Sequence, residues 1–211
     1  MARRVLLVRH GESTNNVLMR RLFARRSAGQ LTPREWERAW LRERATDPDL
    51  TAAGAAEARR LGAWMRRAGV GGGQDGLSTD VLTPRLLVYT SPFKRTLDTT
   101  RWMLDGLGGG SESGTSGARV VVHPELFETG GVYTSDGSGN RVGRGKCLSS
   151  ASIKTMFPGF LTFMLEAGGD GDRPWYQGPW ETDRMCAARA ARVAGWMRRG
   201  AAFHRPGGRG G

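Results

Sequence analysis

An apolar run near the start of the chain ends abruptly in two polar side chains and a glycine. Residues 5–11 read Val-Leu-Leu-Val-Arg-His-Gly, and four consecutive apolar residues before a turn predict a buried β-strand. Open α/β sheets bind their ligands at the carboxyl ends of the strands, so we expect Arg9 and His10 to lie at a binding site. Gly11 allows the backbone to turn sharply beside that ligand.

The side chains of Arg9 and His10 suit chemistry on a phosphate group. A guanidinium binds two oxygens at once, and a neutral imidazole nitrogen is a nucleophile. The alternative interpretation is an ordinary His-Gly turn after a strand, because a three-residue motif also occurs by chance.

A second apolar run at residues 86–90 leads into Ser-Pro-Phe-Lys-Arg at 91–95. This pattern predicts another strand, followed by a helix with Ser91 as its N-cap and Pro92 at its first position. Arg95 then lies in the first turns, near the positive end of the helix dipole. Together the two segments predict a pocket for a doubly charged phosphoryl group.

Four segments in this order resemble the histidine phosphatase superfamily, the phosphoglycerate mutase-like proteins. They are residues 7–16, 49–58, 91–96 and 126–128, and residue 57 is Glu where the family motif has Gln. The resemblance implies that His10 is the nucleophile that becomes phosphorylated, and that Glu128 protonates the leaving oxygen. It also implies a set of phosphate-binding residues that line the pocket: Arg9, Arg95, Asn16 and Ser13.

These roles are chemically consistent without the family. The reference pKa of histidine, about 6.5, leaves much of the imidazole neutral at pH 7. A positioned acid accelerates departure of a poor leaving group by roughly 10²–10⁴-fold, and two arginines stabilise the charge on the transferring group. Such a scheme needs no metal and no cofactor.

Two carboxylates follow the predicted strand at residues 120–122, and either is a candidate acid. Glu125 and Glu128 lie three residues apart. The family places its acid in an L-x-E setting, which selects Glu128, and we expect Glu125 to face solvent in a loop. His123 precedes both and has no second ligand at metal-binding spacing, so we interpret it as an ordinary loop histidine.

The resemblance also implies a second pocket histidine, in a His-Gly pair after a C-terminal strand. The chain has three histidines, and the last, His204, follows no apolar run and precedes Pro206 and a glycine-rich end. We therefore expect the last strand and its histidine to be missing, which leaves catalysis open to question.

Composition excludes several other classes. The formal net charge is +12, but only three of the 32 basic residues are lysines, so we attribute the charge to a general arginine bias rather than to specific nucleic-acid binding. No apolar run is long enough to span a membrane. Cys147 and Cys186 are far apart and form no C-x-x-C motif, which fits a reducing compartment. With no room for a leader before the first strand, we expect a cytoplasmic protein.

The chain alternates strand and helix patterns, which predicts the α/β class. We expect a single three-layer domain over residues 1–200, with a mostly parallel central sheet flanked by helices, and a disordered Gly/Arg-rich tail over 201–211. The expected function is a phosphomonoesterase that forms phosphohistidine and acts on a small phosphorylated metabolite or a phosphoprotein. Two alternatives remain: a phosphoglycerate mutase, and a catalytically impaired or inactive family member acting as a binding module.

Overall fold

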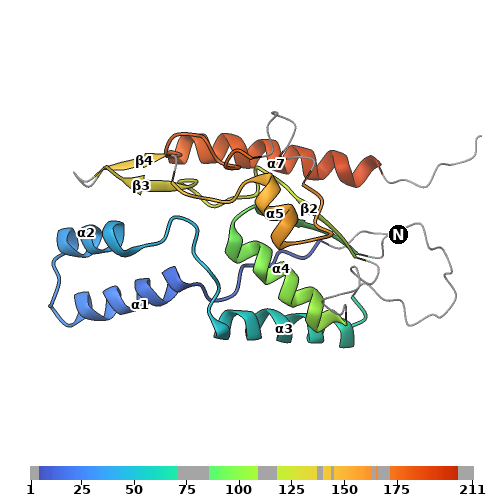
Figure 1. Cartoon of the computed structure of the whole chain (residues 1–211), viewed down its shortest axis with the longest axis horizontal. Helices are drawn as coiled ribbons and strands as arrows, with labels where there is room; N and C mark the ends of the chain where they lie inside the picture. The colour runs from blue at the N-terminus through green and yellow to red at the C-terminus, as the bar shows by residue number, and fades with distance from the viewer. Residues whose placement is uncertain are drawn as a thin grey trace, which may run out of the picture.

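The computed structural model describes residues 5–70, 86–108, 118–136, 140–143, 145–162, 165 and 172–203. Six helices and four strands are defined in these ranges, and Figure 1 labels them. In chain order they are α1 Thr14–Ser27, α2 Pro33–Glu43, α3 Ala52–Arg67, β1 Leu86–Thr90, α4 Lys94–Leu107, β2 Ala118–Val122, β3 Tyr133–Ser135, β4 Arg141–Gly143, α5 Ser150–Met156 and α7 Asp183–Phe203.

The described sheet is small and parallel, as expected for an α/β protein. β1 pairs with β2 in register, with Val88 opposite Val120. On the other side of β2, Leu161 forms a parallel bridge with Val121, so β2 is the middle element. β3 and β4 form a separate antiparallel pair.

The main core forms where α4 and α5 pack on β2. Its buried members lie on the apolar stripes of the helices and on alternate positions of the strand, as binary patterning requires. They are Leu97, Leu104, Ala118, Val120, Val122, Ile153, Phe157 and Phe160. A second, smaller cluster joins α1 to α2, which project together from the rest of the molecule in Figure 1. Trp36 and Trp40 pack against this cluster.

The strand predicted over residues 5–8 is wrong. These residues adopt no regular structure, and their side chains are 45–87% exposed. An apolar run has the propensity for a strand, but the strand forms only where a neighbour supplies hydrogen bonds. Within the described ranges, no segment pairs with residues 5–8.

The C-terminal helix also differs from the sequence pattern. α7 continues to Phe203, inside the segment expected to be a tail, whereas residues 204–211 lie outside the described part. None of the helices described in the structure is long and apolar enough to cross a bilayer.

Candidate active site

The segment that carries His10 is bound to the start of α3. The N–H of Thr51 donates to the carbonyl oxygen of Glu12 at 2.9 Å, and the N–H of Glu12 donates to Oε2 of Glu57 at 3.0 Å. Gly11 and Gly54 approach so closely that a Cβ on either would collide with backbone atoms of the other segment. The first two motifs are therefore fixed against each other.

The same segment also contacts α4. The N–H of Gly11 donates to Oγ1 of Thr99 at 3.1 Å. Lys94, the first residue of α4, is ion-paired with Asp49, which precedes α3. Three segments that are distant in the sequence thus meet at the turn after His10.

The start of α4 is capped differently from the prediction. The N-cap residue is Phe93, whose side chain makes no capping hydrogen bond, and the helix begins at Lys94 rather than at Pro92. The acceptor comes instead from Asp47, whose Oδ1 accepts the N–H of Lys94 at 2.9 Å. The Ser91 cap was wrong because a carboxylate from another segment already occupies the positive end of the helix.

The imidazole of His10 is held in one tautomer. Its Nδ1–H donates to the carbonyl oxygen of Gly11 at 2.7 Å, which leaves the lone pair on Nε2. Partial burial lowers the pKa of His10 below its usual 6.5, and the positive charges of Arg95 and Arg9 lower it further, against opposing effects of the Gly11 hydrogen bond and Glu128. The ring is therefore mostly neutral at pH 7, as a nucleophile requires.

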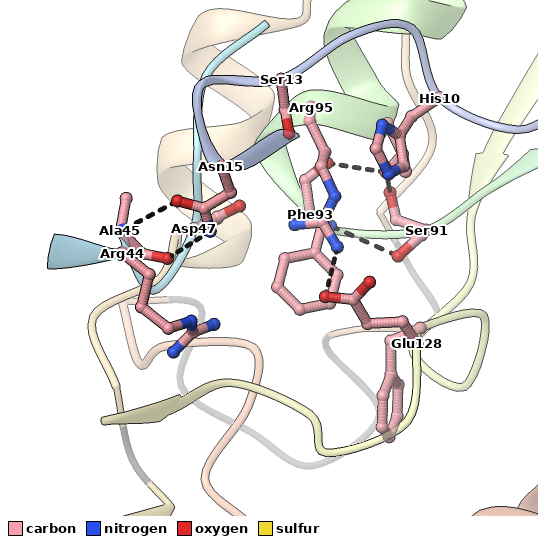
Figure 2. A network of polar contacts seen from close by, with 12 residues as sticks. His10, Ser13, Asn15, Arg44, Ala45, Asp47, Ser91, Phe93, Arg95 and Glu128 are labelled. Carbon is pink, nitrogen blue, oxygen red and sulfur yellow. Dashed lines mark hydrogen bonds and ion pairs between the residues drawn. The ribbon is translucent and has the colours of Figure 1, made fainter. Parts of the chain in front are cut away.

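Arg95 and Glu128 form an ion pair beside His10. Nη2 of Arg95 lies 2.8 Å from Oε1 of Glu128, and the charges of both side chains act on His10. Figure 2 shows Arg95 beside the imidazole and Glu128 farther from it, beyond Ser91. The Arg95 side chain is only 4% exposed, whereas that of Glu128 is 56% exposed. The guanidinium also lies over the ring of Phe93, at 4.1 Å from its centroid, so its position is fixed while the carboxylate can move.

The other predicted phosphate-binding residues are Arg9, Ser13 and Asn16, and no described contact joins them to Arg95 or Glu128. Arg9 is exposed, and its charge acts on His10. Ser13 and Asn16 hydrogen-bond each other as the capping box of α1: Oδ1 of Asn16 accepts the N–H and the hydroxyl of Ser13, both at 2.9 Å. Their polar groups fix the helix that follows the His10 turn.

Neither of the other histidines is placed at His10 by a described contact. His123 is buried, packs on Trp196 with ring centroids 4.3 Å apart, and accepts the N–H of Glu125 on Nδ1. His204 lies outside the described residues. The side chain of Glu125 is 33% exposed and pairs with Arg192 of α7 at the surface, so it lies at the solvent boundary with a partner from the last helix.

Two charged residues near Arg95 were missed in the sequence. Asp47 is largely buried, which raises its pKa to about 6, and its Oδ2 has no hydrogen-bond partner among the described residues.

The second of these residues is Arg44. It stacks on the ring of Tyr133 at 3.9 Å and donates to the carbonyl oxygen of Tyr133 at 2.7 Å. Burial lowers the pKa of Arg44, and its charge acts on Glu128 and Arg95. Asp47 lies two residues before the 49–58 segment, which was the available signal for it. Nothing in the sequence distinguishes Arg44 from the many other arginines.

The described residues therefore bring together a neutral imidazole, a buried guanidinium and an accessible carboxylate. This set provides a nucleophile, an anion-binding group and a proton donor or acceptor within one small region (Figure 2). No group of three or more His, Cys, Asp or Glu side chains in the described ranges is arranged to hold a metal ion.

Comparison with known proteins gives likenesses among solved structures alone. No protein-family model and no curated protein matches the sequence. Among solved structures, the chain is similar to the ecdysone phosphate phosphatase EPPase from Bombix mori in complex with tungstate, with 21% identity and a TM-score of 0.42. The match covers 74% of this chain and 50% of that one, so this chain spans about half the length of the solved structure.

Proposed function

We propose that this chain is a phosphomonoesterase that works through a phosphohistidine intermediate on His10. The observation that carries the proposal is the presence of the buried guanidinium of Arg95 close enough to a tautomer-fixed, mostly neutral imidazole for its charge to lower the pKa of His10. A nucleophile beside a preorganised cation is the arrangement that phosphoryl transfer requires.

The proposed reaction assigns a step to each of these groups. Arg95 and Arg9 bind the phosphoryl oxygens, and Nε2 of His10 attacks phosphorus as the bond to the leaving oxygen breaks. Glu128, which takes up a proton from the monoanionic substrate phosphate or from water when it leaves Arg95, transfers that proton to the leaving oxygen, so the alcohol leaves neutral. A water then attacks the phosphohistidine and gives a proton back to Glu128, which releases phosphate and restores the imidazole.

The ion pair between Arg95 and Glu128 explains how the carboxylate enters the reaction. A substrate phosphate competes with Glu128 for Nη2 of Arg95, because both are anionic acceptors for the same donor. Since the Glu128 side chain is more than half exposed, it is free to turn from Arg95 to the leaving oxygen. The substrates we expect are small phosphorylated metabolites or phosphoproteins.

One assay separates this function from its alternatives. Purified protein and a His10→Ala variant are offered p-nitrophenyl phosphate and a set of phosphorylated metabolites, including phosphoglycerate. We expect phosphate release by the wild type and none above background by the variant, with ³²P trapped on His10 after acid-free quenching. Isomerisation of phosphoglycerate instead of release indicates a mutase, and equal background in both proteins contradicts the proposal and favours a binding module.

A further inference from the structure

The buried side of α7 carries a charge where its sequence pattern predicts apolar contacts. The spacing of Cys186, Ala190, Val193 and Met197 predicts a core stripe, yet Ala190 and Met197 are exposed. Arg189 is instead buried, at 6% exposed, together with Glu181 just before the helix, at 4%. Their side chains form a two-point ion pair, with Nε to Oε1 at 2.7 Å and Nη2 to Oε2 at 2.6 Å.

The rest of the Arg189 guanidinium holds the loop that carries Glu128. Its Nη1 donates to the carbonyl oxygens of Glu125 and Phe127, both at 2.9 Å, and the guanidinium carbon lies 3.6 Å from the centroid of the Phe127 ring. The Phe127 carbonyl belongs to the peptide bond that leads into Glu128. Arg189 therefore fixes the orientation of that peptide.

All the hydrogen-bonding directions of Arg189 are used. A guanidinium has five N–H groups in a fixed plane. Three go to Glu181 and to the sulfur of Cys186, which lies 3.6 Å from Nη2, and two go to the loop carbonyls. A lysine has one ammonium on a flexible stem and cannot reproduce this planar set.

Other contacts from the same region reach the same loop. The N–H of Glu181 donates to the carbonyl oxygen of Gly130 at 3.2 Å, and the hydroxyl of Thr129 lies 3.1 Å from the sulfur of Cys186. Glu181, Cys186 and Arg189 thus contact the loop on both sides of Glu128. Because the Glu128 side chain is mostly exposed, its direction depends on this backbone rather than on packing around the carboxylate.

We infer that Arg189, held in place by Glu181, is a positioning residue that aims Glu128 at the leaving oxygen. The inference rests on the proposed function, since it assigns Arg189 to the proton-transfer step of that reaction. A buried ion pair is weak evidence for stability, because desolvation offsets much of its attraction. Arg189 of this pair donates to the carbonyl of the peptide that leads into Glu128, so the pair has a role in orienting the proposed acid.

The test uses the leaving group as the readout. Departure of p-nitrophenolate needs little help from an acid, whereas departure of an alkoxide depends on it. We expect Glu128→Gln and Arg189→Lys each to lower kcat/KM on β-glycerophosphate by at least about 10-fold, within the range that a general acid contributes, and to change kcat/KM on p-nitrophenyl phosphate by less than about 3-fold. The ratio kcat/KM is the readout because it reports formation of phosphohistidine and not its hydrolysis, which is the same for both substrates. Arg184→Lys, the same substitution at an exposed position of α7, is the matched control and should resemble the wild type on both substrates.

A double variant separates positioning from a general structural effect. If Arg189 acts only through Glu128, Arg189→Lys has no further effect on β-glycerophosphate hydrolysis in the Glu128→Gln background. Equal losses on both substrates from Arg189→Lys, or an additive loss in the double variant, overturn the inference. If Glu128→Gln itself shows no preference between the substrates, or the wild type hydrolyses neither, the proposed function fails instead.

A second variant keeps the test decisive if Arg189→Lys does not fold. Replacing both partners, Glu181→Leu with Arg189→Met, leaves no buried charge unpaired and retains similar volume. Circular dichroism and the thermal midpoint establish that this variant is folded. We expect the same selective loss on β-glycerophosphate, and a folded double replacement with wild-type selectivity contradicts the inference.

Discussion

The backbone N–H of Gly11 donates to Oγ1 of Thr99 at 3.1 Å, and that hydroxyl donates in turn to the carbonyl oxygen of Arg95 at 2.7 Å. Thr99 is buried, at 5% exposed. One hydroxyl thereby connects the turn that presents the proposed nucleophile to the helix that presents the phosphate-binding guanidinium. The distance between His10 and Arg95 depends on a residue that touches neither reacting group.

Replacing Thr99 with Val removes this connection while keeping the shape of the side chain. The N–H of Gly11 then loses its acceptor, and an unsatisfied buried donor costs about 1–3 kcal/mol. We expect the free energy of unfolding in urea to fall by that amount and phosphatase kcat to fall as His10 moves relative to Arg95. Thr99→Ser keeps the hydroxyl and should retain activity. Wild-type stability in Thr99→Val contradicts the prediction.

The titration of His10 is a second prediction. Because burial and then the charges of Arg95 and Arg9 lower its pKa, the imidazole loses its proton below pH 6.5, and kcat/KM should rise with pH through that lower midpoint. A substrate phosphate also titrates near about pH 6, so NMR of the histidine ring protons is the direct measurement.

Two variants complete the His10 titration. His10→Gln removes one of three histidine signals and so assigns it. Arg95→Met removes a positive charge that opposes protonation and should raise the midpoint of His10. A His10 midpoint at or above 6.5 in the unliganded wild type is incompatible with the proposed environment.

The sequence predicted the α/β class, and the structure has a parallel strand pair covered by helices. His10 and Arg95 were selected from the chemistry of short segments, and Glu128 by the family resemblance. The charges of Arg95 and Glu128 both act on His10, and the roles of the three residues stay predictions. The strand at 5–8 was not realised, since a strand depends on a neighbour that local propensity does not specify. The Ser91 cap failed for a similar reason, because Asp47 arrives from a distant segment.

Arg189 illustrates what periodicity cannot reveal. Its position in α7 looks like any other arginine of a charged helix face, and only the tertiary structure shows that the buried side of the helix holds it. Glu181 is distinguishable from an exposed acid only through its partner. A buried ion pair forms where two segments of the fold bring opposite charges together. A single sequence does not show which distant residues will be paired in this way.

The contact between the first two motifs predicts a strong effect of adding one methyl group. A Cβ at residue 54 would collide with backbone atoms of Glu12, and backbone cannot yield as a side-chain tip can. We expect Gly54→Ala to lower the free energy of unfolding by about 1–3 kcal/mol, the usual cost of overpacking, and to reduce activity by displacing the His10 turn. Urea unfolding and p-nitrophenyl phosphate hydrolysis measure the two effects.

The matched control for that substitution is Gly195→Ala in α7. The nearest atom to a Cβ there is the flexible end of Arg199, at 3.3 Å, and alanine is favoured over glycine inside a helix by up to about 1 kcal/mol. This variant should be as stable as the wild type or more so. Equal destabilisation by both substitutions would show that the contact between residues 54 and 12 has no special role.

Asp47 provides the last prediction, in which charge and hydrogen bonding have opposite effects. Burial raises its pKa from 3.8 to about 6, so the folded state binds a proton more tightly than the unfolded state does. The contribution of this group to stability is therefore most favourable below about pH 4, declines as pH rises to about 6, and stays at its lowest value above that. A tenfold change in proton affinity is worth about 1.4 kcal/mol, which limits the penalty at pH 7.5 to about 3 kcal/mol.

Asp47→Asn removes the charge but keeps an oxygen that can accept the N–H of Lys94. We expect this variant to be more stable than the wild type at pH 7.5, with a difference that shrinks toward pH 4. Asp47→Ala removes the acceptor as well and should be less stable than Asp47→Asn by about 1 kcal/mol, the usual value of a helix cap. Urea unfolding of the three proteins at pH 4, 6 and 7.5 measures both effects. If Asp47→Asn is destabilised at pH 7.5 as much as Asp47→Ala, the buried carboxylate is satisfied by its surroundings and the reasoning from burial is wrong.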